Sequence, residues 1–427
     1  MKIGFSRWLS AAVLALSFSQ VAFPSPSAEA VADLYPFTSF TFNSAGILGK
    51  TGPSISQLLT SYDSATSTWL KNTNYFNVSS GIQIWTVPKT GTYQITSAGA
   101  QGVPATSTSG GLGAIMQGTF ALTQGEKYKI LVGQTSVTYA GREGLSSAGG
   151  GGSFVVKNTG STVADILIIA GGGGGTSLAA RLAGANARPD SSTANSSSDN
   201  YVGGSNGNKG TAGNTNNGAG GGFLTGGTGT STNDPDGVSF ISGGNGGYEA
   251  WNYSNLGGGF GGGGSVTNGG NARFSGGGGF NGGGSTSSFA TSDTRTANYG
   301  GGGSSFNRGT NQTNTVGNLG SGYVTIELIV PQSSITISSP STGTYGISLT
   351  ITANVSMEGK VTFYAREKRI PGCINIQSSS LVATCQYKVG TRNSVGISAT
   401  LKPTDATYAT SATPTKFLII SNRATKR

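Results

Sequence analysis

Residues whose side chains could do chemistry are scarce in this chain of 427 residues. It has no histidine, two cysteines, and a charged complement of 26 Lys and Arg and 16 Asp and Glu. Without histidine the chain cannot form a Ser-His-Asp or Cys-His catalytic arrangement, a His-ligated zinc site or a histidine general base. Two cysteines cannot form a four-thiolate metal site. The composition therefore excludes most familiar hydrolase mechanisms.

Two short segments carry weak chemical signals. Residues 44–51 resemble a phosphate-binding loop, but a serine replaces the first glycine and no βαβ pattern accompanies it. Residues 233–237, Asn-Asp-Pro-Asp-Gly, place two carboxylates at a turn. A calcium loop needs more oxygen ligands than these, so the sequence favours a plain Asx-Pro turn. The paired carboxylates of a glycoside hydrolase need no histidine, so that class of enzyme remains an alternative. However, no Asp or Glu of this chain lies in a recognised catalytic motif. We predict a protein that is not an enzyme and that binds no cofactor or metal.

Aromatic residues offer a better candidate for ligand contact. Trp251 lies in a glycine-rich stretch with Tyr248 and Tyr253 beside it. Aromatic rings can stack on sugars or grip a protein ligand. Trp85, by contrast, lies in an alternating segment and is predicted to belong to the core. We therefore predict Tyr248, Trp251 and Tyr253 as ligand contacts.

Residues 1–30 have the pattern of an export signal. Lys2 and Arg7 precede a mostly apolar run at 9–23, and Ala-Glu-Ala at 28–30 fits a small-residue cleavage site. The apolar run is shorter than the ~20 residues of a membrane span and is broken by serines, which disfavours the alternative of an uncleaved anchor. The mature chain is predicted to begin at Val31 without a transmembrane segment. It is expected to be secreted, either released or associated with a cell surface.

Export also predicts the state of the two cysteines. In an oxidising compartment Cys373 and Cys385 are expected to form a disulfide. The 13-residue loop that it closes would be worth roughly 3 kcal/mol by the chain-entropy estimate. The alternative is a free, reactive pair.

Positive charge is concentrated at the C-terminal end. Residues 332–427 contain 11 Lys and Arg against 3 Asp and Glu, whereas residues 31–331 contain 13 against 12. A basic exported module can be attracted to anionic surface polymers or lipids, an attraction that salt weakens. The alternative is an ordinary solvated surface. No nucleic-acid-binding motif accompanies the charge, so we predict no nucleic-acid partner.

Apolar periodicity predicts strands throughout the first part of the mature chain. Residues 82–87 and 92–96 alternate between apolar and polar, with residues 88–91 as a turn, which predicts a β-hairpin. No long stretch shows a helical period. The further predicted strands are 114–122, 127–132, 153–156, 166–169 and, beyond the glycine-rich region, 323–328. This domain is predicted to be an all-β sandwich that carries the glycine-rich region as an insertion.

The glycine-rich region covers about residues 141–303 and contains 50 glycines in 163 residues. It lacks the three-residue period of collagen. One alternative is a flexible linker, because glycine loses much backbone entropy on ordering. However, aromatic residues recur throughout the region, and a solvated linker has no use for them. We predict a bundle of extended polyproline-II-type segments that bond to one another, with aromatics at its rim.

Several motifs of the first domain resemble a known family. Residues 81–88 (GIQIWTVP), followed by 91–93 and 99–100, are similar to the extracellular glycine-rich domain of the anaplastic lymphoma kinase and leukocyte tyrosine kinase receptors. Further pieces match in order at 51–53, 130–134, 149–154 and 167–171. The resemblance covers about residues 37–328. It implies a tumour-necrosis-factor-like jelly-roll sandwich with inserted polyglycine helices and a protein ligand. The family's cysteines are absent from this region, and nothing in the chain matches a kinase.

The C-terminal part has a pattern of short strands and turns of its own. Over about residues 333–420 it is similar to the bacterial immunoglobulin-like repeats of surface proteins, which serve as spacers or adhesive units. The predicted organisation is a signal peptide at 1–30, a glycine-rich sandwich at 31–331, and an immunoglobulin-like domain with a basic tail at 332–427.

These features together predict a secreted or surface-associated, non-enzymatic binding or adhesion protein. Its glycine-rich domain is expected to recognise an extracellular protein or glycan, and its basic domain an anionic surface polymer. The first alternative is a structural component of the cell envelope, and the second is a carbohydrate-active hydrolase.

Overall fold

The computed structural model describes most of the chain. The described residues are 32–62, 67–103, 110–136, 146–177, 182–197, 201–213, 216–228, 234–248, 257–266, 273–286, 298–405 and 408–421. The predicted signal peptide lies outside them, as do two of the three predicted contact residues, Trp251 and Tyr253.

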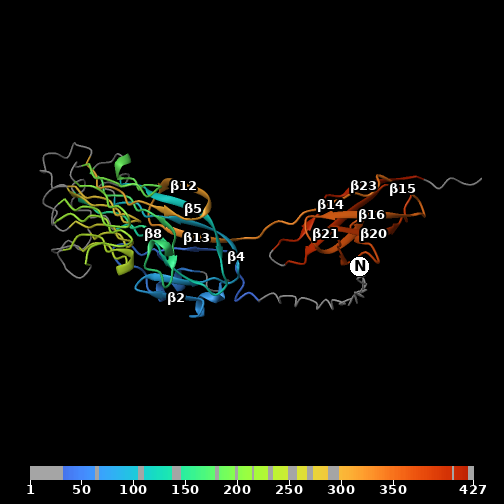
Figure 1. Ribbon diagram of the computed structural model, residues 1–427, viewed down its shortest axis with the longest axis horizontal. Coiled ribbons are helices and arrows are strands. Elements are labelled where there is room, and N and C mark those ends of the chain that lie inside the picture. The colour runs from blue at the N-terminus through green and yellow to red at the C-terminus, as the bar shows by residue number, and fades with distance from the viewer. Residues whose placement is uncertain are drawn as a thin grey trace, which may run out of the picture.

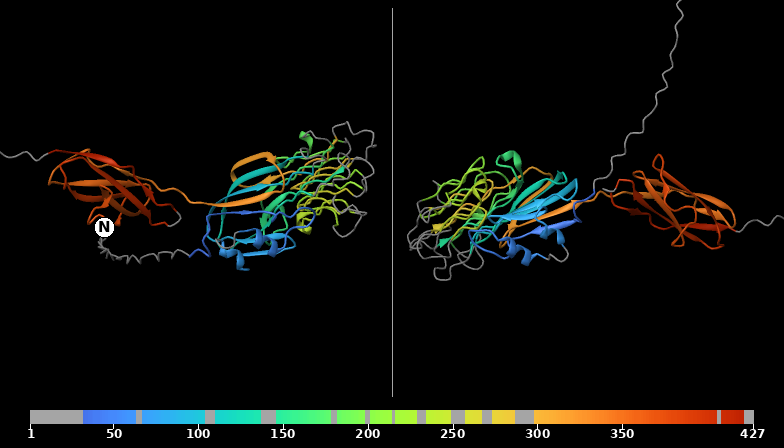
Figure 2. Two further views of the ribbon diagram at one scale, coloured as in Figure 1. Left: turned by 180° about the vertical axis from the view of Figure 1, so that it is seen from behind. Right: turned by 90° about the horizontal axis from the view of Figure 1, so that it is seen from below.

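The described residues are mostly β-structure, which confirms the all-β prediction. They contain one α-helix, α1 (Ile55–Ser61), and 3-10 turns at η1 (Thr68–Lys71), η2 (Val163–Asp165), η3 (Ala183–Ala185) and η4 (Phe240–Ser242). No helix among them is long and apolar enough to cross a membrane. The strands gather into two lobes, separated in all three views (Figures 1 and 2).

Two antiparallel sheets build the first lobe. The first sheet contains, in spatial order, β1 (Ser39–Phe42), β13 (Tyr323–Ile329), β4 (Gly91–Ala98), β5 (Gly113–Leu122) and β12 (Thr310–Asn318). The second contains β11 (Phe306–Asn307), β9 (Ile166–Ala170), β8 (Ser153–Lys157), β6 (Lys127–Leu131), β3 (Ile82–Thr86) and β2 (Phe76–Ser79). A short parallel pair, β7 (Ser146–Ser147) with β10 (Arg273–Phe274), lies in the glycine-rich region.

The predicted hairpin at 82–96 is wrong, although both of its strands exist. β3 pairs with β2 and β6, whereas β4 pairs with β13 and β5 in the other sheet. The turn at 88–91 therefore carries the chain from one sheet to the other. Alternation of apolar residues is the same for a hairpin and for such a crossing, because in both cases each strand buries one face.

The two sheets enclose an apolar core. Trp85 from β3 and Tyr93 and Ile95 from β4 are fully buried there, together with Ile130 of β6 and Ile326 of β13. Thr92, Gln94 and Thr96, which alternate with these buried residues, are more exposed, as period-two alternation requires. The prediction that Trp85 belongs to the core is confirmed.

The glycine-rich region covers the other face of the second sheet. Phe154 of β8 stacks on Phe240 with ring centroids 4.9 Å apart, and Phe223 stacks on Phe240 at 5.4 Å. These rings form a second buried cluster with Phe260 and Phe280. From the sequence we predicted aromatic residues at the rim of this region. Its described phenylalanines lie in the interior instead. They are buried because the apolar outer face of a second sheet needs cover from water.

The glycine segments form a hydrogen-bonded array with a repeat of three residues. The N–H groups of Gly172 and Gly175 donate to the carbonyl oxygens of Gly278 (2.8 Å) and Ser275 (3.0 Å), which are also three residues apart. Gly173 and Gly174, between them, donate to two other segments, at Ala100 and Ala185. Successive residues thus face different neighbours and every third residue returns to the same one, as in a helix of three residues per turn.

The second lobe has two further sheets around a core of its own. One contains β14 (Ile335–Ile337), β16 (Ser348–Val355) and β20 (Val382–Lys388). The other contains β15 (Thr342–Thr344), β23 (Lys416–Ser421), β21 (Val395–Pro403), β17 (Gly359–Ala365) and β18 (Lys368–Arg369), with β19 (Ile376–Gln377) on β17 and β22 (Ser411–Ala412) on β21. Cys373 and Cys385 form a disulfide, buried in this core, with Cα atoms 5.5 Å apart. The predicted pairing is confirmed.

Acid should weaken the second lobe partly through Glu358. The hydroxyl of Ser378 and the N–H of Leu381 donate to its carboxylate and hold the pKa of Glu358 below its usual value. This stabilisation is complete above the unfolded-state pKa of about 4.3 and is lost as the pH falls through the lower folded-state pKa. In the Glu358→Gln variant, we therefore expect the urea unfolding midpoint of the second lobe to change less with pH below about 4.3 than it does in the unsubstituted protein. Circular dichroism would measure this midpoint. An acid dependence equal to that of the unsubstituted protein would contradict this assignment.

Candidate functional site

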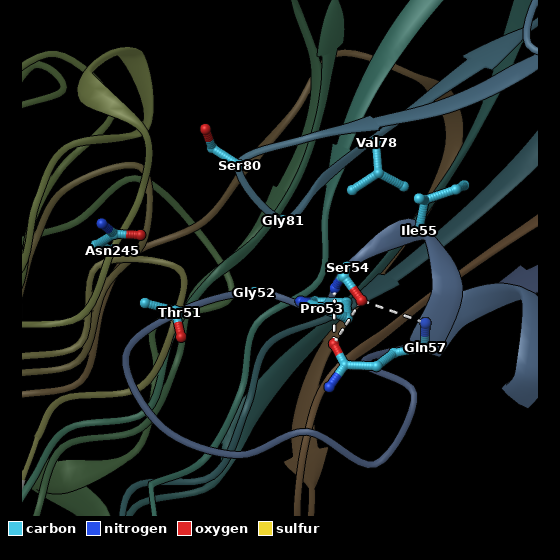
Figure 3. A pocket seen from close by; sticks show the side chains of 10 residues that line it. All are labelled: Thr51, Gly52, Pro53, Ser54, Ile55, Gln57, Val78, Ser80, Gly81 and Asn245. Carbon is cyan, nitrogen blue, oxygen red and sulfur yellow. Dashed lines mark hydrogen bonds between the residues drawn. The ribbon is translucent and has the colours of Figure 1, made fainter.

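The candidate site is a groove where three segments of the first lobe meet (Figure 3). The segment that leads into α1 forms one wall, the turn between β2 and β3 forms another, and Asn245 of the glycine-rich region closes the third side. The volume of the groove is about 510 Å³. The lining residues are Thr51, Gly52, Pro53, Ser54, Ile55, Gln57, Val78, Ser80, Gly81 and Asn245.

Hydrogen bonds fix the wall that leads into α1. The Ser54 N–H donates to Oε1 of Gln57 (2.8 Å), and the Gln57 N–H donates to Oγ of Ser54 (3.3 Å), which forms a capping box. Beside it, the N–H of Gly246 donates to the carbonyl oxygen of Lys50 at 2.9 Å. This bond joins the wall to the glycine-rich region.

A buried carboxamide supports the same wall from below. With its nitrogen turned toward them, the side chain of Gln134 donates to the carbonyl oxygens of Gly49 and Thr51, both at 3.2 Å. Gln134 is fully buried. A buried polar group that is hydrogen-bonded in this way fixes the backbone on which the groove depends.

The turn between β2 and β3 has a conformation that suits glycine. Ser80 and Gly81 have φ values of 48° and 80°. Two successive residues in the left-handed region are typical of a type I′ hairpin turn. Gly81 also packs against Gly52, since a Cβ on Gly81 would lie 2.5 Å from the Cα of Gly52. Two of the residues that line the groove are therefore in close backbone contact.

Tyr248 follows the groove residue Asn245 by three positions in the chain. Its N–H donates to the carbonyl oxygen of Asp234 (3.0 Å), and its own carbonyl oxygen accepts a bond from the hydroxyl of Ser265 (2.5 Å). The ammonium of Lys50 lies 3.6 Å from the centroid of the half-buried ring. This cation–π contact joins the ring to Lys50, the residue that precedes the groove residue Thr51. Of the three predicted contact residues, Tyr248 is placed by the structure, whereas Trp251 and Tyr253 lie outside the described residues.

The lining of the groove is polar but uncharged. None of its ten residues is acidic or basic. Hydroxyl groups, carboxamides and backbone atoms alternate with the apolar side chains of Pro53, Ile55 and Val78. Such a lining can hydrogen-bond to a neutral polar ligand.

The two carboxylates of residues 233–237 serve the glycine-rich fold. Oδ1 of Asp234 accepts the N–H of Asp236 at 3.2 Å, which is an Asx turn and agrees with the sequence prediction. Asp236 is buried, accepts the N–H of Ala219 at 2.8 Å, and pairs with the ammonium of Lys209. Within the described residues no group of three or more Cys, Asp or Glu side chains is arranged to hold a metal ion.

The segment that resembles a phosphate-binding loop, residues 44–51, supports one wall of the groove. The N–H of Gly49 donates to the carbonyl oxygen of Thr135 at 2.9 Å, and the side chain of Lys50 is directed onto the ring of Tyr248. In a phosphate-binding loop such groups face the phosphates instead.

The groove residues were not predicted as a site from the sequence. The capping-box pattern at Ser54 and Gln57 and the Ser-Gly turn at 80–81 were readable signals of local structure. No local signal could bring Asn245 to them, because that contact depends on how the glycine-rich region packs.

Comparison with known proteins adds no assignment. No protein-family model matches the chain, and no curated protein matches it. Function is therefore inferred from the geometry of the groove.

Proposed function

We propose that the protein is an exported, non-enzymatic binding protein that recognises an extracellular protein or glycan through the groove and Tyr248. The observation that carries this proposal is the uncharged polar groove whose walls are fixed by hydrogen bonds from side chains and backbone. A site fixed before binding loses little conformational entropy when a ligand enters. A volume of about 510 Å³ lies in the range of small-ligand sites, large enough for a sugar unit or a short peptide segment.

The position of the glycine-rich region supports a recognition role. Its segments lie at the end of the first lobe that is remote from the second lobe (Figures 1 and 2). In our proposal the first lobe is a tumour-necrosis-factor-like sandwich of the receptor type named above, with β1 and β13 paired at one edge. The second lobe is an immunoglobulin-like stalk that presents the first lobe to its ligand. The buried disulfide fits the proposed export, because disulfides persist in oxidising compartments.

Binding should depend on the groove and on Tyr248. We expect labelled mature chain, residues 31–427, to bind saturably to one class of glycan or cell surface. Tyr248→Ala should weaken this binding at least tenfold, about 1.4 kcal/mol, because it removes the aromatic contact surface. Thr51→Trp, which places a large side chain at the wall, should abolish it. Glycan arrays and flow cytometry on whole cells would measure both effects.

A matched control exists in the second lobe. Tyr345 is 37% exposed and lies under the guanidinium of Arg392, 5.1 Å from its ring centroid. Tyr345→Ala therefore removes an exposed tyrosine with a cationic partner and should leave binding unchanged. Saturable binding that survives both groove substitutions would contradict the assigned site. Self-association without any saturable ligand would favour a structural envelope component, and release of reducing sugar would favour a hydrolase.

A further inference from the structure

Two lysines stand directly opposite each other on the second lobe. In the antiparallel pairing of β17 with β21, Lys360 is the partner of Lys402. Both are exposed, while their neighbours Val361 and Leu401 point into the core. The two ammonium-bearing side chains therefore emerge side by side on the outer face of the larger sheet. Directly opposed side chains have Cβ atoms about 5 Å apart.

This arrangement is unfavourable unless something neutralises it. Like charges directly opposite each other destabilise a sheet. Among the described residues, ion pairs join Lys89 to Asp33 and Lys209 to Asp236, and neither Lys360 nor Lys402 has a described carboxylate within 4.0 Å. The carboxylate of Glu358, two residues before Lys360, accepts hydrogen bonds from Ser378 and Leu381 and is not ion-paired with either lysine in the described structure. An anion from outside the chain would relieve the repulsion.

A carboxamide lies beside the lysine pair. Gln377 of β19 is the partner of Lys360 on its other side, and exposed. The row of Gln377, Lys360 and Lys402 thus offers two positive charges and a carboxamide along one line across three strands.

The charge of the whole lobe extends the attraction beyond this row. Residues 332–427 carry 11 Lys and Arg against 3 Asp and Glu. Such an excess attracts a long polyanion over a distance of about one Debye length, roughly 8 Å at physiological salt. Lysine is a point charge without the fixed fork of arginine, so it accepts anions in many orientations, as a flexible polymer requires.

We propose that the outer face of β17, β19 and β21 binds an acidic polysaccharide, with Lys360 and Lys402 holding one carboxylate between them. The carboxamide of Gln377 donates to a neighbouring sugar oxygen. A polysaccharide fits better than a nucleic acid, since neutral hydrogen-bonding side chains flank the charges and the disulfide of this lobe belongs to an oxidising, extracellular setting. This surface is separate from the groove and does not depend on the function proposed for it.

The test compares two double variants of equal net charge in the full mature chain. Lys360→Gln with Lys402→Gln removes the opposed pair, whereas Lys368→Gln with Lys388→Gln removes two exposed lysines elsewhere in the lobe. Binding to polygalacturonate is measured by biolayer interferometry at two salt concentrations, beside neutral dextran and duplex DNA. Thermal unfolding of each variant is recorded without polymer.

We expect the first variant to lose at least tenfold in affinity for polygalacturonate and the second less than threefold. Without polymer, the first variant should melt at a higher temperature than the unsubstituted protein, because the like-charge contact is gone. Equal losses in both variants would overturn the proposal by showing that net charge alone acts. Binding to polygalacturonate no stronger than to dextran, or weaker than to duplex DNA, would overturn it as well. Tyr248→Ala should leave polygalacturonate binding intact, which separates this surface from the groove.

Discussion

Gly172→Ala is expected to destabilise the first lobe by about 3 kcal/mol, the upper end of the usual cost of overpacking. A Cβ at this position would lie 2.3 Å from the carbonyl oxygen of Gly150 and 2.7 Å from that of Gly151. These obstacles are backbone atoms of a neighbouring segment, so no side-chain rotation can make room. The neighbouring segment must move, and its hydrogen bond from the Gly150 N–H to Gly173 would be strained. Urea unfolding followed by tryptophan fluorescence would measure the loss.

Gly317 provides the control for this substitution. It lies in β12 of the same lobe, and a Cβ there would meet no atom within 4 Å. Gly317→Ala should therefore change the urea midpoint little, or raise it slightly by reducing the freedom of the unfolded chain. If Gly172→Ala were tolerated as well as Gly317→Ala, the tight packing of the glycine segments would be refuted.

Replacing both Cys373 and Cys385 with alanine should cost the second lobe about 3 kcal/mol and leave the first lobe unchanged. The disulfide closes a 13-residue loop and thereby lowers the entropy of the unfolded chain. Trp69, Trp85 and Trp251 are the tryptophans of residues 31–427, and all precede the second lobe. Tryptophan fluorescence therefore reports on the first lobe, while calorimetry and far-ultraviolet circular dichroism detect both.

The expected pattern is a lower calorimetric transition for the second lobe at an unchanged fluorescence midpoint. The unsubstituted protein in reductant should behave like the double variant, because reduction removes the same crosslink. A shift of the fluorescence midpoint as large as that of the second-lobe transition would mean that the two lobes unfold as one unit. Such a result would contradict the independence of the two cores.

Local patterns in the sequence predicted the strands and the disulfide correctly. Alternation at 82–87 and 92–96 corresponds to β3 and β4, and the late segment at 323–328 corresponds to β13. These predictions succeed because the period of a strand is a property of the backbone itself, so each segment shows it without reference to its neighbours. The pairing of Cys373 with Cys385 followed in the same way, since no other cysteine was present.

The pairing between strands was harder to predict from the sequence. The hairpin predicted from β3 and β4 is a crossing between two sheets, because the core needs Trp85 from one side and Tyr93 from the other. Their rings meet at 5.9 Å across the sandwich. The same alternation serves either arrangement, so the decision belongs to the packing of both sheets.

The aromatic residues of the glycine-rich region were likewise predicted only in part from the sequence. Composition alone indicated that a region with so many aromatics is not a flexible linker. It did not indicate that Phe223, Phe240 and Phe260 would be buried against the second sheet. That outcome depends on the outer face of the second sheet being apolar at Leu131 and Phe154, which no property of the glycine-rich region itself reveals.

By itself, the sequence determined the all-β class, the crosslink and the absence of histidine chemistry, since these follow from residue types and from short-range periodicity. The tertiary structure alone decided the groove, which joins Thr51, Ser80 and Asn245 from three distant segments. It alone also placed Lys360 opposite Lys402. Such contacts arise because burying apolar faces and satisfying every glycine N–H are requirements on the whole molecule, and no single segment can meet them.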